Sequence, residues 1–297
     1  MSAHREAELS GAGGLRIYWQ AWHGDGEPRT VVVIAHGAGE HSGRYAHVAA
    51  RLVEDGHAVY AIDHRGHGRS EGARALIDRM DHAVADLDAL VLQARGEHPA
   101  RKLFLLGHSM GGTVALSYAM RHQDRLGGLI LTGPLAALDA APPALRLLAR
   151  ALSAVAPRLP VVGVDASQVS RDPAVVSAYA SDPLVHHGKL PARTVGELGA
   201  AIESFPAGVA AITVPTLIMY GTADSLCPPA GSVMLSERIG AGDRTLKRYE
   251  GLFHEILNEP EQGRVLDDLC AWLDSHARAD RSPDAHDQSP EPGASTR

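Results

Sequence analysis

Apolar runs recur along this chain, and most of them end in a short segment rich in glycine and polar residues. A run of this kind is typical of a strand buried on both faces of a parallel sheet. Residues 15–22 instead alternate between apolar and polar side chains, which predicts an edge strand. The remaining predicted strands are residues 30–35, 57–63, 103–106, 126–132, 214–220 and 245–249.

Helical patterns occupy the stretches between these runs. In residues 80–95 the apolar positions Val84, Leu87, Leu90 and Val91 fall on one helix face that can pack on a sheet. The other predicted helices are residues 45–55, 113–120, 191–205 and 260–272. Strands that alternate with helices predict an α/β fold with a mostly parallel sheet and right-handed crossovers.

The alternation stops after Gly133-Pro134 for roughly eighty residues, where prolines and Asp-Pro turns break up short apolar groups. An insertion of this length after a sheet strand is a typical place for a cap or lid. We therefore expect a core in two parts with a cap between them, followed by a tail poor in apolar residues that we predict to be disordered. The expected ranges are 1–133 and 211–276 for the core, 134–210 for the cap and 277–297 for the tail.

Gly107-His108-Ser109-Met110-Gly111 joins a predicted strand to a predicted helix. A serine between two glycines in this context indicates a nucleophile elbow, because the tight turn leaves no room for neighbouring side chains. The alternative is a glycine-rich turn without chemistry. Ser109 at the helix N-terminus is the predicted nucleophile, and the N–H of Met110 is a predicted oxyanion donor.

A second glycine-rich loop, residues 36–45, follows the strand at 30–35. Such loops at the carboxyl ends of parallel strands are where open α/β sheets build their sites. The N–H of Ala38 is therefore the second predicted oxyanion donor. We expect Gly37 and His108, in these same two segments, to contact the substrate.

Two late strands are each followed by a residue that can complete a catalytic triad. Asp224 comes just after the strand at 214–220, and His254 follows the strand at 245–249. The order serine, acid, histidine is that of α/β-hydrolases. Asp224 would orient His254, which would act as the general base for Ser109. Cys227 is three residues past Asp224 and is expected near the site.

Composition narrows the function classes. The 297 residues are 45% hydrophobic with a formal charge of −7, and acids and bases are interspersed, so the sequence lacks the basic clusters that are typical of nucleic-acid binding. Two distant cysteines and the lack of a signal-peptide pattern favour a cytoplasmic protein. We expect no metal site at the adjacent His186-His187, because adjacent side chains point apart and no carboxylate cluster accompanies them. No organic cofactor is expected either.

Four segments together resemble the monoacylglycerol lipases of the α/β-hydrolase superfamily. They are residues 36–45 (HGAGEHSGRY), 63–72 (DHRGHGRSEG), 107–112 (GHSMGG) and 221–224 (GTAD). The resemblance implies the α/β-hydrolase fold with a helical cap. It also implies Ser109 as nucleophile, Asp224 as acid, His254 as base, and Ala38 and Met110 as oxyanion donors.

These observations predict a serine hydrolase that cleaves monoacylglycerol to a fatty acid and glycerol through an acyl-enzyme. A broader carboxylesterase or lysophospholipase is the nearest alternative, and a ligand-binding module that has lost catalysis is the non-enzyme alternative. Residues 144–155 form a helical pattern with an unusually wide apolar face, which predicts substrate contact at Leu148 and Leu152. The same helix is either buried in the protein or a dimer, or a peripheral membrane contact. Monomer and homodimer both stay open.

Overall fold

The centre of the protein is an eight-stranded sheet in the order β1-β2-β4-β3-β5-β6-β9-β10. The computed structural model describes residues 3–137 and 150–277. From β4 to β10 all neighbouring strands are parallel, whereas β1 and β2 are antiparallel to each other and β2 is antiparallel to β4. The strands are β1 (Ala3–Ser10), β2 (Arg16–His23), β3 (Val31–Ala35), β4 (Ala58–Ile62), β5 (Leu103–His108), β6 (Gly128–Thr132), β9 (Thr216–Gly221) and β10 (Arg244–Tyr249). The predicted mostly parallel sheet is confirmed.

The strand expected at the edge of the sheet is not there. Residues 16–23 form β2, which lies between β1 and β4 and buries five consecutive residues. The edge strand on this side of the sheet is β1, and its charged, largely exposed sequence carries no apolar pattern that would predict a strand. The edge prediction was therefore wrong. The alternation of apolar and polar residues in a strand does not show whether a neighbouring strand pairs with it on one side or on both.

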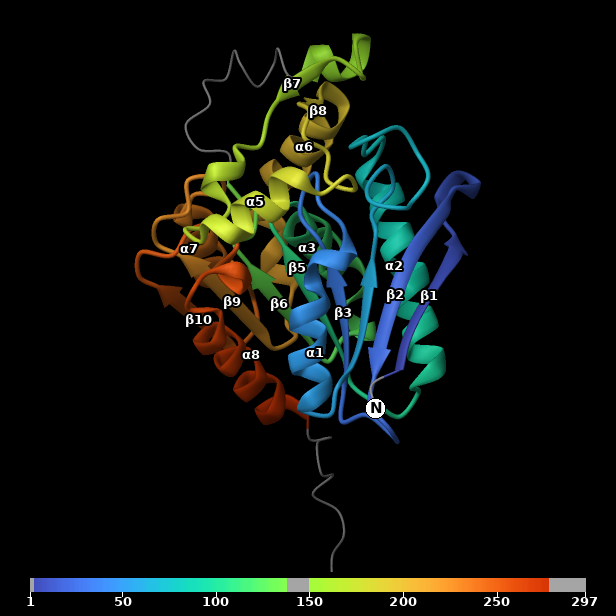
Figure 1. The fold of residues 1–297 in the computed structure, drawn as a ribbon, viewed down its shortest axis with the longest axis vertical. Coiled ribbons are helices and arrows are strands. Elements are labelled where there is room, and N and C mark those ends of the chain that lie inside the picture. The colour runs from blue at the N-terminus through green and yellow to red at the C-terminus, as the bar shows by residue number, and fades with distance from the viewer. Residues whose placement is uncertain (1–2, 138–149, 278–297) are drawn as a thin grey trace, which may run out of the picture.

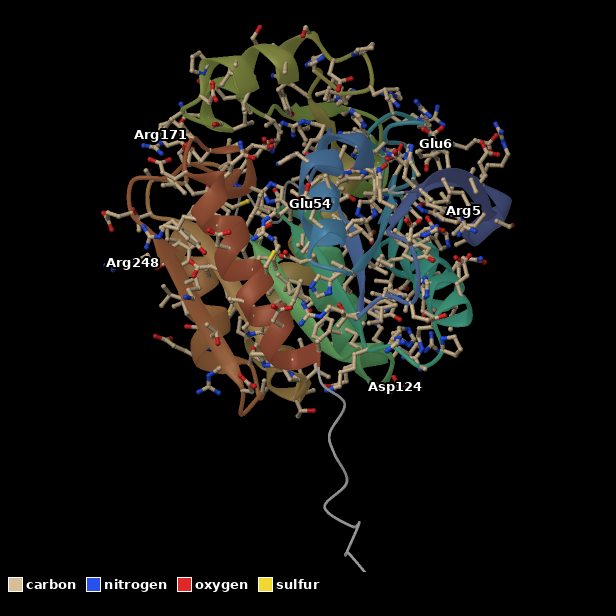
Figure 2. All side chains as sticks on the ribbon, turned by 60° about the horizontal axis from the view of Figure 1, so that its bottom comes forward. Arg5, Glu6, Glu54, Asp124, Arg171 and Arg248 are labelled. Atoms are coloured by element: carbon tan, nitrogen blue, oxygen red, sulfur yellow. The ribbon has the colours of Figure 1, made fainter. Side chains whose placement is uncertain are left out.

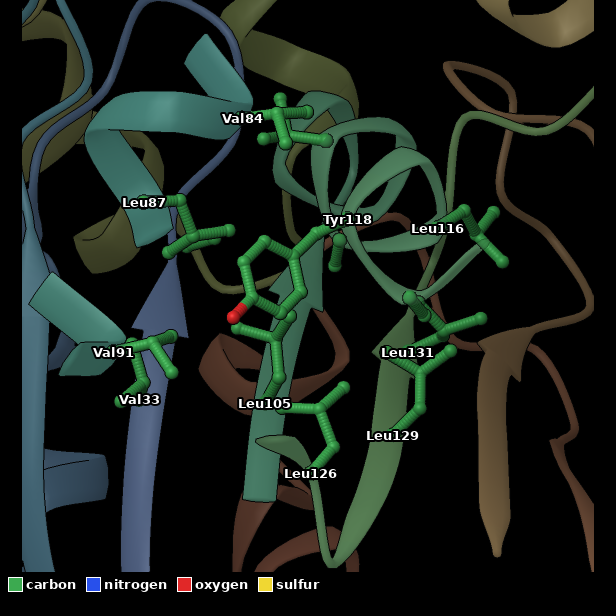
Figure 3. Packing of buried hydrophobic residues seen from close by; sticks show 14 of the residues in the cluster. Val33, Val84, Leu87, Val91, Leu105, Leu116, Tyr118, Leu126, Leu129 and Leu131 are labelled. Atoms are coloured by element: carbon green, nitrogen blue, oxygen red, sulfur yellow. The ribbon is translucent and has the colours of Figure 1, made fainter. Parts of the chain in front are cut away.

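Helices cover both faces of the sheet (Figure 1). Val32 and Ile34 of β3 pack with α1 (Ala46–Glu54) and α8 (Gln262–Ala277), whereas Val31 and Val33 join the cluster on the opposite face. That opposite cluster includes α2 (Met80–Glu97), α3 (Met110–His122), α6 (Ala192–Gly208) and α7 (Pro229–Arg238). In Figure 3, Tyr118 of α3 lies between the apolar side chains of α2 and those of β5 and β6.

Charged side chains of both signs lie around the outside of the molecule. Figure 2 labels examples on β1, on α1, on β10 and between β6 and β9. This distribution agrees with the interspersed charges of the sequence.

An insertion separates β6 from β9 and lies beyond the carboxyl ends of the parallel strands (Figure 1). Its described elements are β7 (Pro160–Val162), α5 (Pro173–Ser181), β8 (Leu190–Pro191) and α6, with a helical stretch at residues 150–155. The structure thus has an insertion after the strand that follows the elbow, where the cap was predicted. The first half of the helix expected at 144–155, residues 144–149, and the tail from residue 278 lie outside the described residues. Within the described ranges, no helix combines the length and hydropathy needed to cross a membrane.

Candidate active site

Ser109 occupies a sharp turn between β5 and α3. Its backbone has φ 52° and ψ −120°, a conformation that side-chain-bearing residues rarely adopt and that costs free energy. The flanking glycines are required by close packing, because a Cβ at Gly111 would lie 2.0 Å from the carbonyl oxygen of Ala35. At Gly107 a Cβ would lie 2.5 Å from the Gly111 carbonyl oxygen. The turn thus holds Ser109 in a strained, fixed position where β5 meets α3.

The loop after β3 lies next to this turn. Gly37 and Ala38 line the same cavity as Ser109, and a Cβ at Gly37 would lie 3.1 Å from the Ser109 Cβ. Among residues 3–137 and 150–277 the N–H groups of Ala38 and Met110 find no hydrogen-bond acceptor. Two unused donors beside one serine hydroxyl can receive the negative charge of a tetrahedral intermediate.

Asp224 and His254 come from neighbouring strand ends and form a buried pair. The His254 Nδ1–H donates to Asp224 Oδ2 over 2.7 Å, and the two side chains are 5% and 0% exposed. The other carboxylate oxygen accepts the backbone N–H groups of Leu226 and Cys227 at 2.9 and 2.8 Å. These bonds fix the orientation of the imidazole, whose Nε2 is left to serve as a base.

The surroundings of two neighbouring histidines in the site shift their pKa values in opposite directions. Burial by itself lowers the pKa of His254, but the hydrogen bond and charge of Asp224 raise the pKa above its ordinary value. His108, whose ring centroid lies 4.7 Å from that of His254, has a lowered pKa because of burial and of the nearby His254. Its Nδ1–H donates to the Thr132 carbonyl oxygen over 2.9 Å, which fixes the orientation of the ring, and the lowered pKa favours the neutral form.

Ser109 and His254 line one cavity that has an apolar and a polar side. The apolar lining comes from the insertion and from the segments after β6 and β9. The polar lining comes from the end of β5, from the loops after β3 and β10 and from Tyr179 of α5. Its apolar residues are Leu135, Val162, Val164, Val169, Leu190, Leu198 and Leu226, and its polar ones include Glu40, His108, Tyr179, His254 and Glu255. Such a cavity suits a ligand with a hydrocarbon chain and a polar head.

The other predicted contact residues divide into three groups. Gly37 and His108 line the cavity, as a substrate-contacting role requires. Leu152 is half-buried in the helical stretch and is not among the described residues that line the cavity, and Leu148 lies outside the described residues. Cys227 is buried with its Sγ 3.6 Å from Ser109 Oγ, and burial raises the pKa of its thiol.

Sequence reasoning missed a buried group of charges in the polar half of the cavity. Arg44 binds Glu40 over 2.6 Å and Glu255 through two hydrogen bonds of 2.6 and 2.7 Å. The guanidinium also lies 4.7 Å from the centroid of the Tyr179 ring. The sequence signals of this charged group were only the spacing of four residues between Glu40 and Arg44 and the position of Glu255 directly after His254.

The polar loop after β4 has a structural role. Asp63 accepts the N–H groups of Ser42 and Arg69, at 2.7 and 2.8 Å. Arg65 pairs with the fully buried Asp86 over 2.8 Å. The loop thus braces the segments around the site.

His186 and His187, considered for a metal site, each lie near a backbone carbonyl. His186 Nε2 is 3.3 Å from the Lys189 oxygen, and His187 Nε2 is 2.9 Å from the Asp182 oxygen. The described residues contain no group of three or more histidine, cysteine or carboxylate side chains arranged to hold a metal ion.

Comparisons with known proteins agree on one family. Residues 26–261 match the family model described as serine aminopeptidase, S33. The chain is 46% identical over 276 residues to a monoacylglycerol lipase of Mycolicibacterium smegmatis, covering 93% of this chain and 99% of that protein. It is 35% identical to the Rattus norvegicus monoglyceride lipase, over 89% of each chain. The crystal structure of Paleococcus ferrophilus monoacylglycerol lipase superposes with a TM-score of 0.77 at 32% identity, over 92% of this chain and 99% of that one.

Proposed function

The chain belongs to the monoacylglycerol lipase family of α/β-hydrolases, and we propose from this that it hydrolyses the ester of monoacylglycerol to a fatty acid and glycerol. One observation carries the proposal. The strained Ser109, Ala38 and His254 of the buried Asp224–His254 pair line a cavity that is apolar on one side and polar on the other, and within residues 3–137 and 150–277 the N–H groups of Ala38 and Met110 have no acceptor.

In the proposed reaction Ser109 Oγ attacks the ester carbonyl while His254 Nε2 takes the serine proton. Asp224 holds the Nδ1–H and stabilises the imidazolium that forms. The N–H groups of Ala38 and Met110 bind the oxyanion of the tetrahedral intermediate. His254 then returns the proton to the glycerol oxygen, the C–O bond breaks, and glycerol leaves an acyl-serine.

Water completes the cycle by the same steps. His254 deprotonates a water molecule that attacks the acyl-serine, and the collapse of the second intermediate releases the fatty acid and regenerates Ser109. No step requires a metal ion or organic cofactor. The apolar lining from the insertion receives the acyl chain, and the polar lining receives the glycerol hydroxyls.

The insertion, residues 134–210, is proposed to act as a cap with peripheral membrane contact. Three of its apolar side chains are exposed: Val155 by 80%, Leu159 by 44% and Val162 by 47%. Apolar side chains at the rim of a lipid site can enter the acyl boundary of a bilayer, where the substrate resides. The insertion would then deliver the substrate from the membrane to the cavity.

A substrate series tests this function. We expect monoacylglycerols to be hydrolysed at least tenfold faster, by kcat/KM, than di- and triacylglycerols of the same acyl chain. Comparable rates on lysophospholipids or simple esters would favour the broader carboxylesterase or lysophospholipase. Activity that persists at the parent level in Ser109→Ala would contradict the assignment of Ser109 as the nucleophile, and no activity on any ester would favour a binding module.

A further inference from the structure

Glu255 is a buried carboxylate directly after the proposed general base. Its side chain is 5% exposed and receives two hydrogen bonds from the Arg44 guanidinium, which is itself only 10% exposed. The N–H of Glu255 donates to the Val169 carbonyl oxygen of the insertion over 2.8 Å. The histidine loop is thus joined at this one residue to both the loop after β3 and the insertion.

The guanidinium carries the connection on to the oxyanion loop. Its Nη1, which donates to Glu255, also donates to Glu40 Oε2, and the second Glu40 carboxylate oxygen accepts the N–H of Gly37 at 2.5 Å and the hydroxyl of Tyr45 at 2.8 Å. Arg44 outweighs the effect of burial on Glu40 and holds the pKa of that carboxyl below its ordinary value. Two buried carboxylates, those of Glu40 and Glu255, therefore share the one Arg44 guanidinium beside His254.

We propose that Glu255 is a positioning residue for catalysis: its buried charge stabilises the imidazolium form of His254, and its bond to Arg44 holds the histidine loop against the oxyanion loop. The inference rests on the proposed function, in which His254 is the base. Glu255 does not touch the reacting atoms, so its effect is exerted through His254 and Arg44.

The charges around His254 explain how Glu255 affects the reaction. In the free enzyme the neutral His254 faces three carboxylates, of Asp224, Glu40 and Glu255, and one guanidinium, that of Arg44. Protonation of His254 in the transition state offsets part of that excess negative charge among buried side chains. Asp224 contributes most to the raised pKa of His254, and Glu255 and Glu40 raise it further.

The remaining titratable groups around the ring do not reverse this effect. They are His108 at the end of β5, Cys227 after β9, Tyr45 after β3 and Tyr179 of α5. Burial holds each of them in its neutral form, because it lowers the pKa of His108 and raises the pKa values of the thiol and of both phenols. Among the described residues around the ring, the carboxylates of Asp224, Glu40 and Glu255 and the guanidinium of Arg44 are thus the groups whose charges act on His254.

The test is Glu255→Gln, which keeps the shape of the side chain and removes its charge. Its matched control is Glu250→Gln in the same loop, where the side chain is 82% exposed. The measurement is kcat/KM against pH on a short soluble ester, with active sites counted by a fluorophosphonate. Without the carboxylate the imidazolium is less stable, so His254 loses its proton at lower pH. We expect the acid limb of Glu255→Gln to move down by about 0.5 to 1 pH unit, with the control unchanged.

Two further variants separate charge from geometry. Arg44→Lys keeps the positive charge but loses the paired hydrogen bonds, so its plateau should fall several-fold while its acid limb stays in place. An acid limb that stays in place in Glu255→Gln, or that moves as far in Arg44→Lys, would overturn the proposal. If Glu255→Gln does not fold, Glu255→Met removes the charge at similar volume and must show the same downward shift.

His254→Ala distinguishes this inference from the function on which it rests. If that variant keeps its activity, the proposed triad is wrong. If it is inactive and the limb of Glu255→Gln has not moved, the triad stands and only the role of Glu255 is rejected.

Discussion

The sheet core and the insertion differ in how far they bury their apolar side chains. In the core, strands β3 to β6 and β9 are buried along their whole length between two large apolar clusters. The insertion has one small buried cluster of its own, formed by Val169, Tyr179 and Val185, and it exposes apolar side chains. The groups proposed to do chemistry all belong to the core, where close packing limits their movement.

Polar contacts supply much of the attachment between the two regions. The His41 ring lies 2.8 Å from an Asp182 carboxylate oxygen, and the His186 N–H donates to the Gly39 carbonyl oxygen over 2.7 Å. On the histidine side, Arg171 binds the fully buried Glu259 over 2.8 Å. From this difference we expect substitutions in the core to lower the activity on all substrates alike. Substitutions on the outer face of the insertion should lower the activity by an amount that depends on the substrate.

The largest effect is expected in the core. Ser109→Ala, His254→Ala and Asp224→Asn should each lower kcat by about 10⁴ or more, because each removes part of one proton-transfer unit. The loss should be the same for a long-chain monoacylglycerol and a short soluble ester. Steady-state kinetics on purified variants measure it, with circular dichroism to show that the fold is kept. A loss confined to the long-chain substrate would contradict the division between the two regions.

A second prediction concerns the stability of the core below the site. His36, His64 and His67 form a buried cluster, with ring centroids of the first two 4.6 Å apart. Burial lowers the pKa of His64 to about 3 and that of His67 to about 4, below the value of about 6.5 for an unfolded chain. The unfolded state therefore binds more protons, and the stability present above pH 6.5 falls as the pH decreases.

Between pH 7 and pH 5 each of these two histidines should cost about 2 kcal/mol of unfolding free energy. Urea titrations at both pH values measure the loss. His64→Gln should reduce the pH dependence by about that amount, and His23→Gln, at the half-buried end of β2, should not. Equal unfolding free energies at pH 7 and pH 5 in the parent protein would show that these histidines are not held neutral.

The smallest effect is expected at the surface of the insertion. Changing Val155 and Leu159 together to serine should reduce sedimentation with liposomes and slow hydrolysis of long-chain monoacylglycerol about threefold to tenfold. A short soluble ester should be hydrolysed at nearly the parent rate, because neither change reaches the catalytic groups. Leu92→Ser on α2, 49% exposed and outside the insertion, is the matched control. Equal losses on both substrates would indicate a packing role, and unchanged sedimentation would remove the membrane contact.

Local patterns predicted the parts of the fold whose cause lies within a few neighbouring residues. Apolar runs predicted β3, β4, β6 and β9 because both faces of these strands are buried, and the periodicity of residues 80–95 predicted α2. The charged strand β1 left no such pattern, since its place at the edge depends on pairing with β2. For the same reason β2 was wrongly expected at the edge of the sheet.

The sequence by itself determined the elbow and the chain order of serine, acid and histidine, because glycine spacing and strand ends are local features. The tertiary structure alone decided which distant side chains meet. Arg44 and Glu255 are 211 residues apart, and Ser109 and Cys227 are 118 apart, yet both pairs are in contact. No periodicity encodes such contacts, because they arise only when parallel strands bring their carboxyl-end loops to one edge of the sheet.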